Sequence, residues 1–289
     1  MDYQETLIYG DVMAMGKRKW EDFALDVAIG GSINDKNVNS TRYDSKNASL
    51  KYANVFNLAN IVMNGSASID QKIDSRRQLQ SVFGTAQVGY QDKVFLDLTA
   101  RNDWASTLAY TSHEKSGFFY PSAGLSFLID KWIQLPEWIS FAKLRGTYSK
   151  VGNDLPHFIT NSVSHITAGG ELQANDAAPF KEMEPEMTHS VEVGTEWRFF
   201  QSRLGFNLTY YRTNTHNQFF KLPALAGDMY AYRYVNAGDI QNRGWELTVD
   251  ATPVLTPDFT WKTSLNFSSN RNKIKELHEE LKELVYGPS

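Results

Sequence analysis

One stretch, residues 80–104, constrains the fold more than any other part of the chain. In residues 94–101, Val94, Leu96, Leu98 and Ala100 alternate with Phe95, Asp97, Thr99 and Arg101, and residues 82–89 alternate in a similar way. Between them, residues 91–93 are short and polar, which is typical of a hairpin turn. A period of two predicts β-strands with one apolar and one polar face. Each arm has about ten to twelve residues, which exceeds the common strand length of ~5–6 and matches the ~9–11 residues of a tilted strand that crosses a bilayer.

The rest of the chain repeats this amphipathic unit. We therefore expect about ten strands in antiparallel order. They are expected at residues 6–15, 20–31, 80–90, 94–104, 118–130, 140–152, 188–200, 203–215, 245–251 and 259–270.

The expected connections between these strands alternate in length. Short turns fall near residues 17, 92, 134, 201 and 255, and long loops fall near residues 55, 110, 170 and 228. The polar segments 32–79, 153–187 and 216–239 are expected to be such loops, and loops longer than about 12–15 residues are usually functional or disordered. An outer-membrane barrel has this pattern, because its turns are short on the periplasmic side and its loops are long outside.

Aromatic residues gather near the ends of the expected strands, where a membrane protein places its interfacial girdles. They are Trp20, Tyr90, Trp104, Phe118, Tyr120, Trp132, Trp138, Phe199, Phe200, Tyr210, Tyr211 and Trp261. The predicted fold class is therefore all-β: an antiparallel up-and-down transmembrane β-barrel, present here as an incomplete barrel of about ten strands. We expect residues 1–289 to form part of one barrel domain.

Composition is compatible with this fold and excludes several others. The 289 residues contain no cysteine, which excludes a disulfide framework, and a net charge of −4 spread along the chain gives no nucleic-acid footprint. The chain contains no run of about 18 apolar residues, so no membrane-spanning helix is predicted. The mean hydropathy of −0.43 fits a soluble protein or a β-barrel equally well, because every second residue of a barrel strand faces a polar lumen.

The two ends of the chain carry further expectations. Met1 is followed by a segment with neither a basic stretch nor an apolar core, so we expect no signal peptide and interpret the chain as a fragment or an internal start. Near the other end, Ile274, Leu277, Leu281 and Leu284 recur at three- and four-residue steps. This spacing predicts a short amphipathic helix over residues 274–285, with an exposed loop helix or an effect of truncation as the plainer interpretation.

Charged side chains on the polar faces of the expected strands are the candidate functional residues. In a barrel they face the lumen, where they could pair across strands, contact a plug or line the path of the solute. These candidates are Asp97, Arg101, Lys143, Arg145, Glu192, Glu196, Arg198, Glu246 and Asp250. A second group lies where strands leave the membrane on the outside and forms a candidate extracellular rim: Asn102, Asp103, Trp104, Asn153 and Asp154.

No pattern of catalytic or metal-binding residues stands out. The six histidines form no metal-ligand spacing, so we expect no metal and no cofactor, and no nucleophile–base or carboxylate pair predicts an enzyme. Amphipathic strands by themselves also fit a soluble β-sandwich or barrel that binds carbohydrate, because such a sheet likewise hides one face and wets the other. Strand length and alternating loop length favour the membrane barrel.

Several phrases resemble the SusC/RagA class of TonB-dependent outer-membrane transporters, which import nutrients in Bacteroidota. They occur in the order of that family and cover most of the chain from Gln80 onward. The phrases are FLDLTARNDWASTL (95–108), FFYPSAGLSFLID (118–130), ISFAKLRGTYSKVGND (139–154), EMTHSVEVGTEWRFFQSRLGFNLTYYRTNTHNQFF (186–220), YVNAGDIQNRGWELTVDATPV (234–254) and WKTSLNFSSNRNKI (261–274).

The resemblance implies a larger assembly than this chain. A member of that family has a barrel of about 22 strands with a plugged lumen. It also implies energy from TonB–ExbB–ExbD through an N-terminal part, a SusD-like lid lipoprotein, contact with outer-membrane lipid, and a glycan or peptide substrate. Residues that match the plug, the TonB box and the last strands are not found in this chain, and we expect the segment to transport nothing alone.

Overall fold

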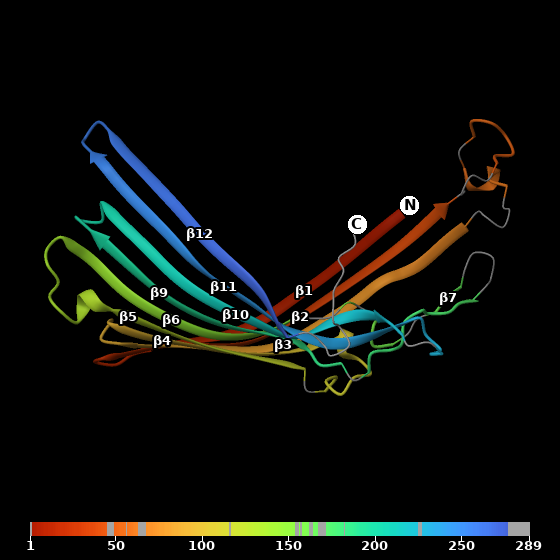
Figure 1. The fold of residues 1–289 in the computed structure, drawn as a ribbon, viewed down its shortest axis with the longest axis horizontal. Coiled ribbons are helices and arrows are strands. Elements are labelled where there is room, and N and C mark those ends of the chain that lie inside the picture. Colours follow the sequence, from red (N-terminus) through yellow and green to blue (C-terminus); the bar gives the residue numbers. More distant parts are fainter. Residues whose placement is uncertain are drawn as a thin grey trace.

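The computed structural model describes residues 2–44, 49–55, 57–62, 68–115, 117–153, 156, 158–161, 164–166, 172–181, 183–224 and 227–276. Ten strands form one antiparallel sheet that is bent into a trough (Figure 1). They follow one another as β1 (Asp2–Lys19), β2 (Phe23–Asp44), β3 (Ser68–Tyr90), β4 (Val94–Ala105), β5 (Phe118–Leu128), β6 (Ile139–Asn153), β9 (Glu186–Phe199), β10 (Leu204–Pro223), β11 (Tyr232–Leu255) and β12 (Thr260–Glu276). The predicted ten-stranded antiparallel sheet is confirmed.

Small elements occupy the connections. The 3-10 turns η1 (Leu58–Asn60), η2 (Ser106–Leu108) and η3 (Ile129–Lys131) follow β2, β4 and β5, and the two-stranded pair of β7 (His165–Ile166) and β8 (Leu172–Gln173) lies between β6 and β9. Each strand of the large sheet pairs with its neighbours in sequence order, so the topology is up-and-down. Within the described residues, β1 and β12 pair on one side only, and the sheet is not closed.

The turn at residues 91–93 shows how the hairpins are made. Gln91 and Asp92 have φ angles of 50° and 52°, the positive values of a type I′ turn, which the Lys93 N–H closes by donating to the Tyr90 carbonyl at 2.9 Å. Tyr90 and Val94 then face each other as the first pair of the β3–β4 ladder. The short polar turn predicted here is confirmed.

Strand boundaries differ from the predicted ones mainly at the end of the sheet that carries the long loops. β2 continues to Asp44 and β3 begins at Ser68, so the loop expected over residues 32–79 is wrong at both of its ends. β10 continues to Pro223 and β11 begins at Tyr232, which shortens the loop expected over 216–239. At the opposite end, the turn expected near residue 17 lies within β1, and the chain reverses after Lys19.

The two faces of the sheet differ in polarity, and the difference is opposite to that of a soluble protein, in which apolar side chains are buried. Apolar side chains are the exposed ones: Val193 is 55% exposed and Leu125 is 51% exposed. Thr209, on the opposite face, is only 9% exposed. Such a sheet is polar on its crowded concave side and apolar on its outer side, which is the arrangement of a barrel in lipid.

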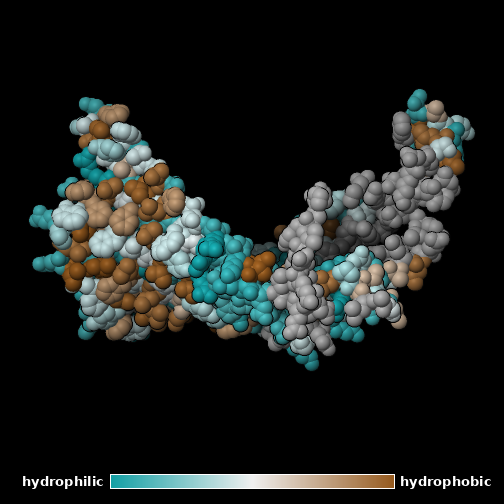
Figure 2. All heavy atoms as spheres, viewed as in Figure 1, coloured by the Kyte–Doolittle hydropathy of each residue, from teal (hydrophilic) through white to brown (hydrophobic). Residues whose placement is uncertain are grey.

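Hydrophobic side chains of the outer side are not spread evenly along the strands. Figure 2 shows them gathered over the end of the sheet that carries the short turns, and a hydrophilic area follows toward the long loops. We call these two parts the turn-side half and the loop-side half of the sheet.

A small hydrophobic core lies at the loop-side end. It contains Leu108, Phe118, Ile159, Phe180 and Met183, with Leu108 and Met183 fully buried. Phe219 and Tyr234 from the extensions of β10 and β11 pack against it. The loops after β4 and β6 therefore fold onto the polar face and are held there by apolar packing.

The C-terminal helix expected over residues 274–285 lies mostly outside the described residues. β12 continues through Glu276, so residues 274–276 are strand, and the rest of that helix stays a prediction. Among the described residues, no helix has the length and hydropathy needed to cross a membrane.

Candidate functional site: the polar face of the sheet

The register of the strands brings the nine charged candidates onto one face. Directly opposed residues of an antiparallel sheet point to the same side. One such row runs from Asp97 through Gly124 and Thr147 to Glu192, across β4, β5, β6 and β9. A second row runs from Lys143 to Glu196, and a third pairs Thr209 with Glu246. The remaining candidates lie an even number of residues from these on the same strands.

Arg145 reaches across two strand boundaries of this face. Its Nη2 donates to Asn207 Oδ1 at 3.2 Å and to Thr209 Oγ1 at 2.7 Å, and both acceptors lie on β10, two strands away from β6. Gly194 on β9 makes this possible, because a Cβ at that position would lie 2.8 Å from Arg145 Nε. The glycine therefore leaves a path over which the guanidinium group ties three strands together.

Three of the candidates meet around a polar hollow of about 300 Å³ near the turn-side end. Glu196, Arg198 and Asp250 line it together with Asn207 and Thr248. Glu196 Oε1 accepts from Arg198 Nη2 at 2.8 Å and from Arg198 Nε at 3.0 Å, so this pair is held as a unit. The hollow presents a cationic guanidinium donor and anionic carboxylate acceptors to the lumen.

Asp97 lies in a separate hollow of about 320 Å³ on β1–β4. Its carboxylate accepts a hydrogen bond from Gln87 Nε2 at 2.6 Å, across the β3–β4 ladder. Lys17 and Asp26 border the same hollow, and Lys17 Nζ lies 3.4 Å from Asp26 Oδ1. The polar face thus carries two distinct charged areas, one at each side of the sheet.

The rim candidates divide between the two faces. Asp103 is buried and its Oδ1 accepts from Arg101 Nε at 2.6 Å, while Arg101 Nη2 donates to Ser81 Oγ at 2.8 Å. Asn102 and Trp104 point to the outer side, and Trp104 Nε1 donates to the Lys115 carbonyl at 3.0 Å.

The last two rim candidates follow β6. Asn153 Nδ2 donates to Glu186 Oε1 at 2.7 Å, which joins the loop-side ends of β6 and β9. Asp154 lies outside the described residues. The role of the five rim candidates and of the nine charged candidates stays a prediction.

Sequence reasoning missed an amide clamp in the loop-side half. Asn236 Oδ1 accepts from the Glu184 backbone N–H at 2.7 Å, and its Nδ2 donates to the carbonyls of Glu184 and Asn217 at 2.8 and 2.7 Å. Asn217 Nδ2 in turn donates to Glu184 Oε2 at 2.8 Å. No local pattern marks these residues, because the clamp forms only when the loop before β9 folds against the β10–β11 extension.

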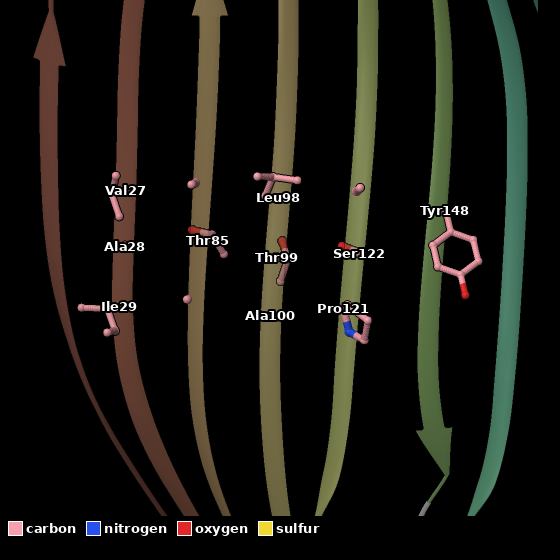
Figure 3. Close-up of a pocket in the computed structure, with 13 residues that line it drawn as sticks. Val27, Ala28, Ile29, Thr85, Leu98, Thr99, Ala100, Pro121, Ser122 and Tyr148 are labelled. Atoms are coloured by element: carbon pink, nitrogen blue, oxygen red, sulfur yellow. The ribbon is translucent and has the colours of Figure 1, made fainter.

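A further hollow, of about 520 Å³, lies on the apolar outer side across β2–β6 (Figure 3). Ile29, Leu98 and Tyr148 border it, and the small side chains of Ala86 and Ala100 leave room between them. It contains no pair of groups suited to acid–base chemistry. Across the described part of the chain, no three His, Cys, Asp or Glu side chains cluster closely enough to hold a metal ion.

The comparison with known families decides what kind of sheet this is. Residues 4–278 match the family model described as "TonB dependent receptor-like, beta-barrel". The chain belongs to the TonB-dependent receptor β-barrel family. It is therefore an outer-membrane barrel segment, whose short turns face the periplasm and whose long loops face outward.

Two curated relatives support the assignment of this TonB-dependent receptor barrel. It is 30% identical over 210 residues to TonB-dependent receptor P26 of Formosa agariphila, covering 69% of this chain and 21% of the relative. It is 25% identical over 218 residues to TonB-dependent receptor SusC of Bacteroides thetaiotaomicron, covering 70% of this chain and 21% of the relative. The chain thus spans about a fifth of the length of the curated relatives it matches.

Solved structures show the same fold. The RagAB peptide transporter superposes with a TM-score of 0.83 at 19% identity, covering 96% of this chain and 31% of that chain. The outer membrane transporter YddB from Escherichia coli superposes with a TM-score of 0.63 at 11% identity, covering 94% of this chain and 34% of that chain. The TonB-dependent receptor barrel is thus similar in shape to about a third of each complete structure.

Proposed function

We propose that this chain forms part of the wall of a TonB-dependent importer that carries oligosaccharide or oligopeptide nutrients across the outer membrane. The observation that carries the proposal is the polar face, where Arg145 and the Glu196–Arg198 pair are held by hydrogen bonds toward the lumen. Such fixed donors and acceptors suit a solute rich in hydroxyl or amide groups, because they replace the hydrogen bonds with water that the solute gives up on binding. Similarity to SusC and to the RagAB peptide transporter supports the same class.

The candidate residues take two roles in this proposal. The nine charged residues line the lumen, where they contact a plug domain of the complete receptor or the passing cargo. The rim residues, Asn102 and Trp104 among them, lie at the external boundary, where a tryptophan ring can stack on a sugar or sit in the lipid interface.

Three partners follow from the proposed class. A SusD-like lipoprotein closes over the long loops, and TonB–ExbB–ExbD supplies energy through the N-terminal part of the complete receptor. Outer-membrane lipid covers the apolar side, where the 520 Å³ hollow accepts acyl chains. We expect transport only from a complete barrel.

The second candidate, a soluble β-sandwich that binds carbohydrate, lacks support from the packing. A sandwich buries the apolar face of each sheet against a second sheet. Among the described residues, the second sheet is only the pair β7–β8, and Val193 and Leu125 remain more than half exposed. A free carbohydrate-binding module is therefore not the function we propose.

Uptake in the source bacterium tests the proposal. We expect deletion of the receptor gene to abolish uptake of one class of fluorescent substrate, either oligosaccharides or oligopeptides, and an uncoupler to stop uptake in the intact strain. The matched pair of variants is Arg145→Gln, on the lumen side, and Lys131→Gln, an exposed cation in the turn η3 after β5. Only Arg145→Gln should slow uptake.

Unchanged uptake of every glycan and peptide mixture after deletion contradicts the import function. Recovery of the chain without detergent as a monomer with cooperative unfolding favours the soluble module instead.

A further inference from the structure

Three arginines interrupt the apolar outer side at a single level of the sheet. Arg212 on β10 lies directly opposite Arg243 on β11, and Arg243 lies directly opposite Arg271 on β12. All three are exposed. Like charges directly opposite each other on neighbouring strands destabilise a sheet. A row of three cations therefore needs a counter-charge from somewhere.

The described side chains supply no such counter-charge. No carboxylate of the described residues lies within ion-pairing distance of Arg212, Arg243 or Arg271. Arg212 has neutral partners, because its Nε donates to Asn214 Oδ1 at 3.1 Å and, with the Gln241 amide oriented toward it, its Nε and Nη2 donate to that amide oxygen at 2.8 Å. Asp239, four residues from Arg243 on the same face of β11, accepts from Asn214 Nδ2 at 2.9 Å, so this acid is engaged beyond the row.

The position of the row relative to lipid is fixed by its neighbours. Two residues toward the turns, Tyr210 and Trp245 pack against each other with ring centroids 4.7 Å apart. One further step brings Leu208, Leu247 and Phe267 to the same face. Tyrosine and tryptophan mark the boundary between hydrocarbon and headgroups. The arginines thus follow immediately beyond that boundary, in the hydrophilic area that succeeds the hydrophobic one in Figure 2.

A hollow of about 230 Å³ lies between the arginines and the aromatic pair. Arg243 and Arg271 border one part of it, and Tyr210, Trp245 and Ser269 border the rest. The hollow therefore combines two guanidinium groups, two hydroxyl groups and an apolar floor. Guanidinium groups bind phosphate through paired hydrogen bonds, and the aromatic floor suits the first carbons of an acyl chain.

We propose that Arg243 and Arg271, with Tyr210, Trp245 and Ser269, form a binding site for the phosphate of an anionic lipid in the outer leaflet. Arg212 extends the positive row next to this site. The site requires the outer-membrane placement of the barrel and is independent of the cargo. The lipid headgroup neutralises the opposed arginines, and its acyl chains continue over the apolar band below.

Native mass spectrometry of the full receptor in detergent tests the site. The receptor is incubated with equal amounts of phosphatidylglycerol and phosphatidylcholine that carry identical acyl chains, and the bound copies are counted. We expect a preference for phosphatidylglycerol of about thirtyfold. Each arginine near a membrane surface strengthens the binding of an anionic lipid about fivefold, and two arginines act together here. The double variant R243Q/R271Q should retain both lipids equally.

Two further variants keep the test decisive. The double variant K131Q/K262Q removes two exposed cations at the turn side and should keep the preference. The variant R243K/R271K retains both positive charges, so it keeps any charge that folding requires at these positions. It should lose part of the preference because lysine lacks the paired donors. Heat-dependent mobility on a gel verifies that each barrel is folded.

Three results overturn the proposal. One is equal retention of both lipids by the unchanged receptor, and another is a preference that survives in R243Q/R271Q. The third is displacement of phosphatidylglycerol by inorganic phosphate regardless of acyl-chain length, which identifies a site for free phosphate instead of lipid.

Discussion

The turn-side and loop-side halves of the same strands follow different rules. In the turn-side half of β10, Phe206 and Leu208 face outward while Asn207 and Thr209 face the lumen. In the loop-side half of β2, residues 34–41 are polar on both faces except for Val38. Alternation therefore marks the part of a strand that separates lipid from a polar lumen, and its loss marks the part with water on both sides.

The two halves also differ in what holds them together. The turn-side half relies on ladder hydrogen bonds and on side chains such as Arg145 that cross several strands. The loop-side half adds a compact core around Leu108 and Met183 and the clamp at Asn236. Water on both faces provides no support from lipid, so the loops supply the packing themselves.

A charge placed on the outer side separates the halves most strongly. Val249→Arg, on the outer side of the turn-side half of β11, should destabilise the folded barrel by about 2–4 kcal/mol, because the charge enters the hydrocarbon. Val235→Arg, in the loop-side half of β11, should cost about 1 kcal/mol or less. Urea unfolding in lipid vesicles measures both. Equal losses at the two valines would break the distinction between the halves.

Filling the path of Arg145 should have the next largest effect. Gly194→Val places methyl groups where Arg145 crosses β9, and loss of its two hydrogen bonds should cost about 1–3 kcal/mol. Gly16→Val is the control, since nothing lies within 4 Å of a Cβ at Gly16. In the Gly194→Val background, Arg145→Gln should add little to the loss of unfolding free energy. Full additivity would show that the two residues act separately.

The amide clamp sharpens the comparison from the loop side. Asn236→Ala removes three hydrogen bonds to Glu184 and Asn217 and should lower local stability by about 1–2 kcal/mol while the barrel stays folded. Hydrogen–deuterium exchange should quicken at the Glu184 amide and stay unchanged in β4. Asn266→Ala, on β12, removes one exposed hydrogen bond that Thr248 of β11 donates, and it serves as the control. Faster exchange throughout the sheet would contradict a local role.

The smallest effect is expected at an exposed ion pair. Lys17 and Asp26 lie 3.4 Å apart with side chains 79% and 43% exposed. Lys17→Gln should change the unfolding free energy by less than about 1 kcal/mol, because solvent and salt screen such pairs. Unfolding at low and high salt measures it, and a large loss that persists at high salt would assign Lys17 a structural role.

Much of the sheet could be predicted from the sequence, because lipid on one side and a polar lumen on the other impose a period of two. Alternation located the ten strands and placed Asp97, Arg145 and Glu196 on one face. The extensions of β2, β3, β10 and β11 were missed for the same reason. Side chains that meet water on both faces carry no period, so polar strand and polar loop have the same composition.

The contacts of the site could be predicted from the sequence less fully than the fold. Single strands show which residues are charged, whereas hydrogen bonds depend on register between strands, as Arg145 with Thr209 illustrates. Arg212, Arg243 and Arg271 each break the alternation of one strand, but only the register reveals that they form a row. The clamp at Asn236 depends on a loop that is distant in sequence.

The reach of β2 has a consequence for how anything arrives at this receptor. At about 3.3 Å per residue its 22 residues extend roughly 70 Å along the strand, about twice the ~30 Å of hydrocarbon that a membrane offers. Even tilted, the strand stands well clear of the lipid. The barrel wall therefore extends beyond the lipid on the loop side, and a molecule that approaches it contacts protein before it contacts the membrane.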